Sequence, residues 1–315
     1  MLDQVMQSSD VLSENKQAAA GIDSAKIDRT WLNAGFRELD VDYDAATNIF
    51  QCRFQYTERP SFTPDVLNDL TRVRGLVASL VNRMNVPVKY FVLASNMPGI
   101  FSLGGDLHLF SQLIRDRDRD GLTAYARTCV GEVHANSMSL GLPIVTISLV
   151  QGDALGGGFE TALSSNVIIA ERSAKFGLPE IMFNLFPGMG AYNYIARRTS
   201  VAIAERMIMS GRVYTGEELF DMGIVDVLAD DGKGDQAVKD YVRKNSSRHT
   251  AHRAIYDVRE RVTPITLEDL NTITDVWVDT ALALRPIDLK MMERLVSAQD
   301  RRRSRSLPGQ SGQDE

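Results

Sequence analysis

Cysteine, histidine and long apolar runs are all scarce in this 315-residue sequence. Its two cysteines, Cys52 and Cys129, form no CxxC pair, which argues against a disulfide framework and a thiolate metal cluster. The four histidines, at positions 108, 134, 249 and 252, share no spacing typical of a metal site. No apolar run approaches the roughly 18 residues of a membrane-spanning helix, and the first residues lack the segments of a signal peptide. We therefore expect a cytoplasmic protein without a metal ion.

Positive charge is in deficit as well. The chain has 35 Lys and Arg residues against 41 Asp and Glu residues, which gives a net charge of −6. Nucleic acids and anionic membranes would be repelled by most of such a surface, so small molecules or proteins are the expected partners. The hydrophobic fraction of 44% is high enough for a substantial core. Composition thus predicts a globular protein.

Hydrophobic periodicity predicts an α/β fold for the middle of the chain. Residues 36–54 alternate as a hairpin does, and after Thr63 and Pro64 apolar residues recur at helical spacing. Further along, apolar runs of about five to eight residues alternate with helical stretches, a pattern typical of buried, largely parallel strands joined by crossover helices. Strand-like runs end near residue 230. The α/β core is accordingly expected over residues 35–230.

The two ends of the chain differ from this core. Residues 1–34 are polar and weakly periodic, and we treat them as an N-terminal arm without an assigned structure. Residues 231–300 contain three helical patterns, which predict a helical C-terminal subdomain. Residues 301–315 are polar with Pro and Gly, so a disordered tail is expected. We interpret the RDRDRD run at 115–120 and RRRSR at 301–305 as solvated loops, with docking of an acidic protein as the alternative.

Two glycine turns, SLGGD at 102–106 and ALGGGFE at 154–160, each follow an apolar strand. Glycine lets backbone N–H groups approach a ligand, and the N–H groups at a helix start are unpaired. Two such turns that converge on one oxygen would stabilise an oxyanion, for instance the enolate of a thioester. A single glycine turn more often serves tight packing, so for each turn that alternative stays open.

Glu160 and Glu180 lie in the apolar stretches GGGFETAL and FGLPEIMF. An unpartnered carboxylate is costly to bury. Two carboxyls whose pKa values are separated by their surroundings can act as base and acid. In the structural alternative, one caps a helix and the other pairs with an arginine such as Arg197 or Arg198.

Four segments are shared with a known superfamily: FSLGGDLHLF, VQGDALGGGFETALSSNVIIAE, AKFGLPEIMFNLFPGMGA and GEELFDMGIVD. In order and spacing they resemble the crotonase (enoyl-CoA hydratase/isomerase) superfamily over residues 36–230. LFPGMGAYNYIARR and the C-terminal TDVWVDTAL and MERLVSAQDRR are similar to the diffusible signal factor synthases, which make cis-2-unsaturated fatty acids for bacterial quorum sensing. The resemblance implies a crotonase-like spiral ββα core with a helical C-terminal subdomain.

The resemblance also implies roles for individual residues. The oxyanion-hole amides fall on Gly105 and Gly157, and the catalytic pair falls on Glu160 and Glu180; which glutamate is the base stays open. The synthases dehydrate 3-hydroxyacyl thioesters of acyl carrier protein to the cis-2-enoyl thioester and then hydrolyse the thioester. No cofactor is implied beyond the thioester of the carrier protein or of CoA, which is the substrate.

An acyl substrate needs an apolar tunnel. Leu155, Trp277 and Leu295 match positions that line this tunnel in the similar synthases. Met182 and Phe186 are further candidates, as is Met189. Apolar residues at helical spacing usually belong to the core, so that alternative stays open for each of them.

Two other functions remain open at this point. One is a CoA-dependent enoyl-CoA hydratase of fatty-acid metabolism, with trans geometry and no thioester hydrolysis. The other is a non-catalytic binding protein that keeps the fold. The resemblance further implies acyl carrier protein as a partner, a homotrimer or dimer of trimers as the assembly, and a sensor protein as a regulator, although no residue marks that contact.

Overall fold

The computed structural model describes residues 35–306, with side-chain burial up to residue 297. The expected arm at 1–34 and residues 307–315 of the expected tail lie outside the described residues. The strands are β1 (Leu39–Asp44), β2 (Ile49–Phe54), β3 (Tyr90–Ser95), β4 (Ile100–Ser102), β5 (Val145–Val150), β6 (Asp153–Leu155), β7 (Val167–Glu171), β8 (Lys175–Gly177), β9 (Val213–Thr215) and β10 (Val227–Ala229). The α-helices are α2 (Pro64–Asn82), α3 (Leu107–Arg115), α4 (Arg119–Ser137), α5 (Gly157–Ser164), α6 (Ala191–Arg198), α7 (Val201–Ser210), α8 (Gly216–Asp221), α9 (Gly234–Asn245), α10 (His249–Val262), α11 (Leu267–Leu282) and α12 (Pro286–Ser306). Short 3₁₀ turns are η3 (Ser139–Gly141), η4 (Pro179–Phe183) and η5 (Ser246–Arg248).

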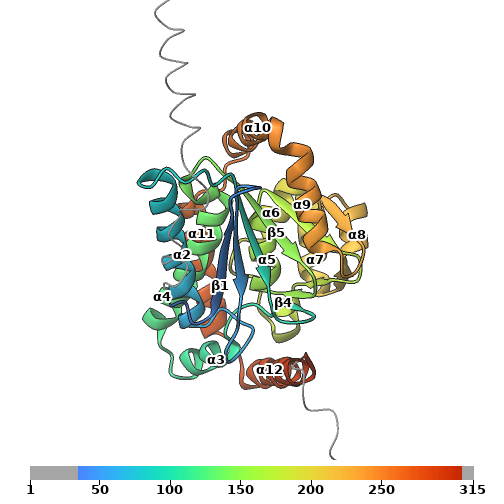
Figure 1. Ribbon diagram of the computed structural model, residues 1–315. Coiled ribbons are helices and arrows are strands. Elements are labelled where there is room, and N and C mark those ends of the chain that lie inside the picture. The colour runs from blue at the N-terminus through green and yellow to red at the C-terminus, as the bar shows by residue number, and fades with distance from the viewer. Residues whose placement is uncertain (1–34, 307–315) are drawn as a thin grey trace, which may run out of the picture. The chain divides into compact units, whose positions relative to one another are not determined.

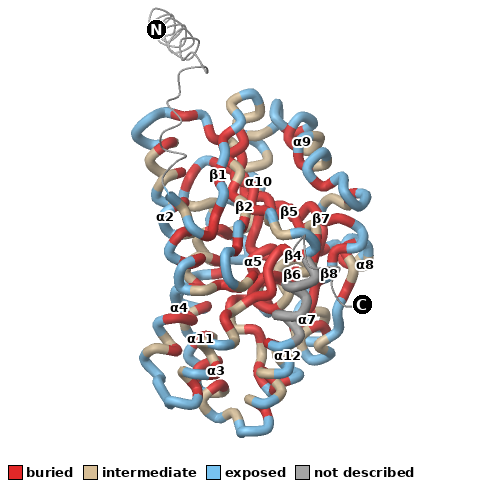
Figure 2. The backbone as a smooth tube through the Cα atoms, turned by 60° about the horizontal axis from the view of Figure 1, so that its bottom comes forward, coloured by how far each residue is buried: buried red, intermediate tan, exposed pale blue. Residues whose placement is uncertain are grey.

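The main sheet has the strand order β1-β2-β3-β5-β7-β10 (Figure 1). Only the β1–β2 hairpin pairs antiparallel, and the other neighbours in this sheet are parallel. Every residue of β5 and β7 is buried, as the apolar runs predict for central parallel strands. The predicted α/β class is confirmed. Figure 2 shows β5 and α5 within the buried interior.

Alternate residues of β3 face different helices. Tyr90, Val92 and Ala94 belong to an apolar cluster that contains Val238 and Val242 of α9. Phe91 and Leu93 face a cavity lined by α2 and α4. Helix α9 therefore covers one face of the sheet, and α2 and α4 cover the other face.

A second, smaller sheet has the order β4-β6-β8-β9. Strands β4 and β6 are parallel, with Ser102 paired to Ala154. Because parallel strands end at the same edge of a sheet, the glycine turns that follow β4 and β6 lie side by side. This small sheet positions the functional site.

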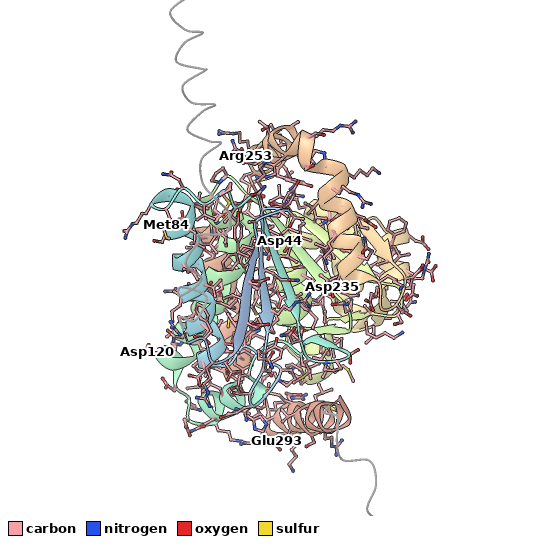
Figure 3. All side chains as sticks on the ribbon, viewed as in Figure 1. Asp44, Met84, Asp120, Asp235, Arg253 and Glu293 are labelled. Carbon is pink, nitrogen blue, oxygen red and sulfur yellow. The ribbon has the colours of Figure 1, made fainter. Side chains whose placement is uncertain are left out.

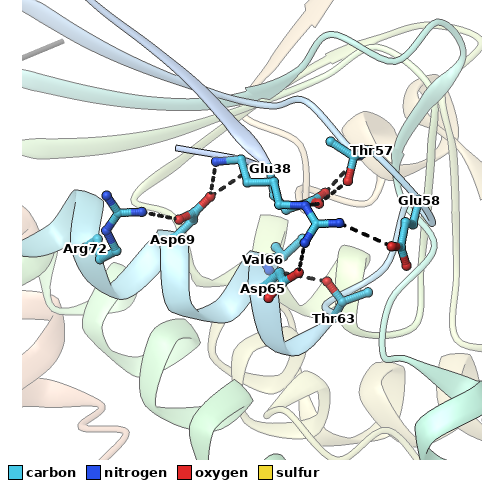
Figure 4. A network of polar contacts seen from close by, with 9 residues as sticks. Glu38, Thr57, Glu58, Thr63, Asp65, Val66, Asp69 and Arg72 are labelled. Atoms are coloured by element: carbon cyan, nitrogen blue, oxygen red, sulfur yellow. Dashed lines mark hydrogen bonds and ion pairs between the residues drawn. The ribbon is translucent and has the colours of Figure 1, made fainter. Parts of the chain in front are cut away.

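Helix α2 begins as its sequence predicts and is tied to β1. The Thr63 hydroxyl accepts a hydrogen bond from the Val66 N–H at 3.3 Å, and Pro64 occupies the first turn. The buried Asp69 carboxylate accepts the N–H groups of Arg37 and Glu38 at 2.7 and 2.9 Å (Figure 4). These contacts hold α2 firmly against the start of β1.

The C-terminal region contains the three predicted helices as α10, α11 and α12. Helix α9 was not predicted from the sequence. Helix α12 continues to Ser306, past the expected boundary at residue 300, so RRRSR at 301–305 lies in a helix rather than in a loop. Among residues 35–306, no helix has the length and apolar character needed to cross a bilayer.

Ion pairs connect α11 and α12 to the RDRDRD region. Arg115 pairs with Glu293, which Figure 3 shows on α12, and Arg119 pairs with Asp279 of α11. The interpretation of this run as a solvated loop is thus incomplete, because two of its arginines bridge helices far apart in the sequence. Such exposed pairs help to orient the helices but contribute little stability each.

Candidate active site

The two glycine turns are in direct contact. Gly104 has a φ of 92°, and a Cβ at this position would lie 2.7 Å from the Leu155 carbonyl oxygen and 2.8 Å from the Gly157 nitrogen. Only glycine allows both this backbone conformation and this approach. The convergence of SLGGD and ALGGGFE that the sequence suggested is present in the structure.

The amides of Gly105 and Gly157 are free to bind a ligand. Neither N–H has a hydrogen-bond acceptor within residues 35–306. Both glycines line one cavity, and the Gly105 nitrogen lies only 3.4 Å from where a Cβ on Gly157 would be. Gly157 also opens helix α5, where unpaired N–H groups are expected. Two adjacent free donors form an arrangement that can stabilise an oxyanion.

Tyr125 of α4 fixes the chain directly after Gly105. Its buried hydroxyl donates to the Phe62 carbonyl oxygen and accepts from the Asp106 N–H at 2.9 Å. The Phe62 N–H in turn donates to the Gly104 carbonyl at 2.8 Å. This network holds the peptide that follows the Gly105 amide. Tyr125 was missed in the sequence, because nothing in its local pattern signals a contact with a turn about twenty residues away.

Glu160 lies in the first turn of α5 with 1% of its surface exposed. Its Oε1 accepts hydrogen bonds from the N–H groups of Met189 and Ala191, at 2.7 and 2.9 Å. Burial raises the pKa of this carboxyl, and the two N–H donors offset part of that increase by stabilising the anion. The Glu160 carboxyl thus lies in an apolar environment in which hydrogen bonds stabilise one of its oxygens, Oε1.

Glu180 lies in η4 and turns its carboxyl inward although the residue itself is half-buried. Its Oε2 is buried without a hydrogen-bond partner, and its Oε1 lies 2.6 Å from where a Cβ on Gly156 would be. Burial raises the pKa of Glu180, and the negative charge of Glu160 raises it further. Two N–H groups stabilise the Glu160 anion, whereas Oε2 of Glu180 has no donor, so this geometry favours a shared proton on Glu180.

The structural alternative for the two glutamates is realised only in part: Glu160 caps α6 by accepting the N–H of its first residue, Ala191, but the expected arginine pairing is absent. Arg197 Nη1 donates to both carboxylate oxygens of Glu260 at 2.7 Å, and Arg198 pairs with Asp226 at 3.1 Å. Among the described residues, neither Glu160 nor Glu180 forms an ion pair with an arginine. Two buried carboxyls that share one apolar cavity and lack a cation are typical of acid and base chemistry.

Both glutamates line one cavity, together with the two glycine turns. Its inner walls are apolar side chains from α3, α4, η4, the loop after η4 and α11, chiefly Phe110, Ala126, Phe183, Leu185 and Trp277. A Cβ on Gly188 would lie 2.8 Å from the Trp277 indole, so this glycine makes room for the ring. The cavity suits a ligand with a polar head at the glycine turns and an apolar body.

The six expected acyl-tunnel residues are distributed unevenly. Trp277 and Met189 line the cavity. Leu295 and Phe186 pack against the apolar cluster around Trp277, one layer behind the wall. Leu155 contacts the region of Gly177 instead, and Met182 is exposed on the surface.

Cys129 lines the cavity as well, but its chemistry is that of an apolar wall. Burial raises the pKa of its thiol to about 12, so the thiolate needed for nucleophilic attack is not formed near neutral pH. Among the described residues, no group of His, Cys, Asp and Glu side chains is arranged to hold a metal ion. The described site therefore offers amides and carboxyls as its reactive groups.

Comparisons with known proteins agree with this geometry. Residues 61–268 match the model of the enoyl-CoA hydratase/isomerase family. The mitochondrial methylglutaconyl-CoA hydratase of Rattus norvegicus is 33% identical over 153 residues, which are 48% of this chain and 46% of that protein. The chain thus matches about half the length of this curated relative.

Solved structures show the same fold. Enoyl-CoA hydratase from Bacillus halodurans superposes with a TM-score of 0.69 at 20% identity, over 82% of this chain and all of that one. Pseudomonas aeruginosa DspI superposes with a TM-score of 0.60 at 21% identity, over 84% of this chain and 96% of that one. At these identities the likeness concerns the fold alone.

Proposed function

This chain belongs to the enoyl-CoA hydratase/isomerase family, and we propose that it dehydrates a 3-hydroxyacyl thioester and then hydrolyses the thioester to release a cis-2-unsaturated fatty acid. Its resemblance to the diffusible signal factor synthases implies this activity. The supporting observation is that two free amides and two buried glutamates meet in one cavity. Such a site can stabilise an enolate and transfer protons at the adjacent carbons.

The proposed binding mode follows from the positions of the glutamates. The thioester carbonyl oxygen accepts hydrogen bonds from the Gly105 and Gly157 amides, each of which can lower the barrier by about 2.7–4 kcal/mol. Glu180 lies against Gly156 and therefore faces C2, next to the carbonyl carbon. Glu160 lies farther along α5, against the Met189 amide, and faces C3.

In the elimination, the shared proton starts on Glu160. The Glu180 carboxylate removes the proton from C2, and the electron pair forms the C2=C3 double bond. The C3–O bond breaks as Glu160 donates its proton to the departing hydroxyl, and water leaves. The proton now resides on Glu180, and the Glu160 carboxylate is stabilised by the N–H groups of Met189 and Ala191.

The hydrolysis uses the pair in the opposite sense. The Glu160 carboxylate removes a proton from a water molecule that attacks the thioester carbon, and the two amides hold the tetrahedral oxyanion. The C–S bond then breaks as Glu180 protonates the leaving sulfur, which releases the acid and the carrier thiol. The proton is again on Glu160, so one proton serves both steps.

The second candidate is a CoA-dependent hydratase, which the name of the rat relative favours. In this reaction the Glu160 carboxylate activates a water at C3 while Glu180 donates its proton to C2. The hydrogen bonds to Glu160 suit this addition, because they stabilise its carboxylate while Glu180 holds the proton. A non-catalytic binding protein is the third candidate, against which stands the free-energy cost of two buried carboxyls without a cation.

The three candidates can be separated with purified protein. Incubation with 3-hydroxyacyl carrier protein should yield free cis-2 acid, measured by mass spectrometry. If the protein turns over only trans-2-enoyl-CoA, the synthase proposal fails and the hydratase is its function. If neither substrate is turned over, the non-catalytic binding protein is the remaining candidate.

Acyl carrier protein as a partner and a homotrimer or dimer of trimers as the assembly are part of the proposal. Helix α10 supports self-association, because its Ile255, Val258 and Val262 are 63%, 56% and 73% exposed along one stripe. Light scattering should report a trimer or hexamer, and Ile255→Glu should shift it towards monomers. A sensor protein as regulator is likewise a proposal from the resemblance.

A further inference from the structure

A second apolar cavity lies directly behind the catalytic one. It lies between α2, α4 and β3, and most of its wall is apolar, including Phe62, Leu67, Phe91, Leu93 and Val133. Cys129 and Met189 line both cavities, so these two side chains stand between them. Protein interiors leave few voids larger than a water molecule, so an apolar space beside the catalytic cavity is unusual.

Met189 is suited to open a passage between the cavities. Its N–H donates to Glu160 Oε1 at 2.7 Å, which fixes the backbone. Its Sδ lies 2.5 Å from where a Cβ on Gly157 would be, so the thioether fills the space beside an oxyanion amide. A methionine side chain has three rotatable bonds and can swing away without moving its backbone.

We propose that the cavity between α2 and α4, here called the rear chamber, binds the distal part of the acyl chain, with Met189 at its entrance. The inference rests on the proposed function, which places the carbonyl at Gly105 and Gly157. A chain in that position passes C3 at Glu160 and meets Met189 next, because the Met189 amide contacts this glutamate. Continuity with the catalytic cavity therefore selects the substrate's own acyl chain as the occupant.

The outer end of the rear chamber is polar. Arg74 of α2 forms an ion pair with Glu132 of α4 at 3.3 Å, and the Thr71 hydroxyl donates to Glu132 at 2.6 Å. An apolar chain gains nothing by contact with these charged groups. Because α2 is held in place by the Asp69 network (Figure 4), the distance from Met189 to this polar end sets an upper limit on chain length.

Filling the rear chamber tests the proposal. Leu70 lines it from α2, whereas Leu76 of the same helix is similarly half-buried and lies outside it. Leu70→Trp should lower kcat/KM about fourfold for each methylene that it excludes from the chamber, and leave the shortest 3-hydroxyacyl thioester unaffected. Leu76→Trp should leave the chain-length profile unchanged. A loss that is equal at all chain lengths, or the same profile in both variants, would overturn the proposal.

A binding measurement separates this proposal from the proposed function. The fluorescent fatty acid cis-parinaric acid should bind the wild type, and Leu70→Trp should weaken binding at least tenfold while Leu76→Trp does not. If the wild type turns over no thioester, the proposed function fails and this binding still decides the chamber. Equal binding by all three proteins would refute the chamber, as would a chain-length profile that responds to Trp277→Ala and not to Leu70→Trp.

Discussion

Replacement of Tyr125 by phenylalanine tests how the oxyanion hole is positioned. The substitution removes only the hydroxyl that joins the Phe62 carbonyl to the Asp106 N–H. Both backbone groups are buried, and a buried group left without its partner costs about 1–3 kcal/mol. The adjacent Gly105 amide should therefore lose its fixed position.

The magnitude follows from what still holds the turn. The Phe62 N–H donates to the Gly104 carbonyl at 2.8 Å, and the Leu103 N–H to the Pro60 carbonyl at 2.7 Å. The Gly105 amide is thus loosened rather than lost, so the barrier should rise by less than the roughly 2.7–4 kcal/mol of a complete donor. We expect Tyr125→Phe to lower kcat about 10- to 100-fold, with KM nearly unchanged.

Steady-state kinetics of dehydration, measured far below the unfolding temperature, provides the assay. Tyr90→Phe is the matched control, because the Tyr90 hydroxyl is buried without a hydrogen-bond partner and lies on β3. This control should retain kcat. If Tyr125→Phe lowers stability in urea but leaves kcat at the wild-type value, the hydroxyl serves only folding and the reasoning is refuted.

Four further predictions address the glycine turns, the glutamates and the C-terminal helices. Glu160→Gln should keep the hydrogen bonds from the 189–191 loop and the fold, yet lose about 10²–10⁴-fold in kcat, whereas Glu160→Ala should also lower stability in urea unfolding. Because burial raises the folded-state pKa of Glu180, the folded protein binds this proton more tightly, and the stability it contributes at low pH is lost as pH rises towards that pKa. Glu180→Gln should therefore be more stable than the wild type at pH 8 and similar to it at pH 5; the opposite order would contradict the pKa direction. Gly104→Ala should abolish activity, since its Cβ would meet backbone atoms of both turns, and full activity would exclude their contact. Arg197→Ala leaves the Glu260 side chain, which is only 14% exposed, without its cation and should cost about 3 kcal/mol in urea unfolding, and a cost below 1 kcal/mol would show that the pair is solvated.

The sequence predicted the α/β class because apolar runs of strand length alternate with helical stretches. It did not predict helix α9, whose segment GDQAVKDYVRKN is mostly polar. Val238 and Val242 are buried in the core cluster, and the partly buried Ala237 and Tyr241 pack beside them. These four positions have helical spacing but span less than two turns, which makes a short periodic signal in a polar segment. The charges of RDRDRD were interpreted as solvated because their partners, Asp279 and Glu293, lie more than 150 residues away in the chain.

In the candidate site, too, the sequence predicts some features and not others. Glycine turns and acidic residues in apolar stretches are visible in the sequence because their residue types are unusual in those places. The partners of these groups are not visible, because they are backbone atoms. The N–H groups of Met189 and Ala191 stabilise the Glu160 carboxylate, and any residue except proline carries such a donor.

The loop that contains Met189 links the proposed chemistry to the proposed chain binding. Its backbone N–H fixes Glu160, and its side chain lies between the two cavities. Gly190, with a φ of 105°, gives the loop the turn that brings the Ala191 amide to the same carboxylate oxygen. The Met189 side chain can rotate while its backbone N–H stays on Glu160. An acyl chain that displaces the thioether therefore need not disturb the glutamate. Chain length can therefore change through the walls of the rear chamber while the proton transfers remain the same.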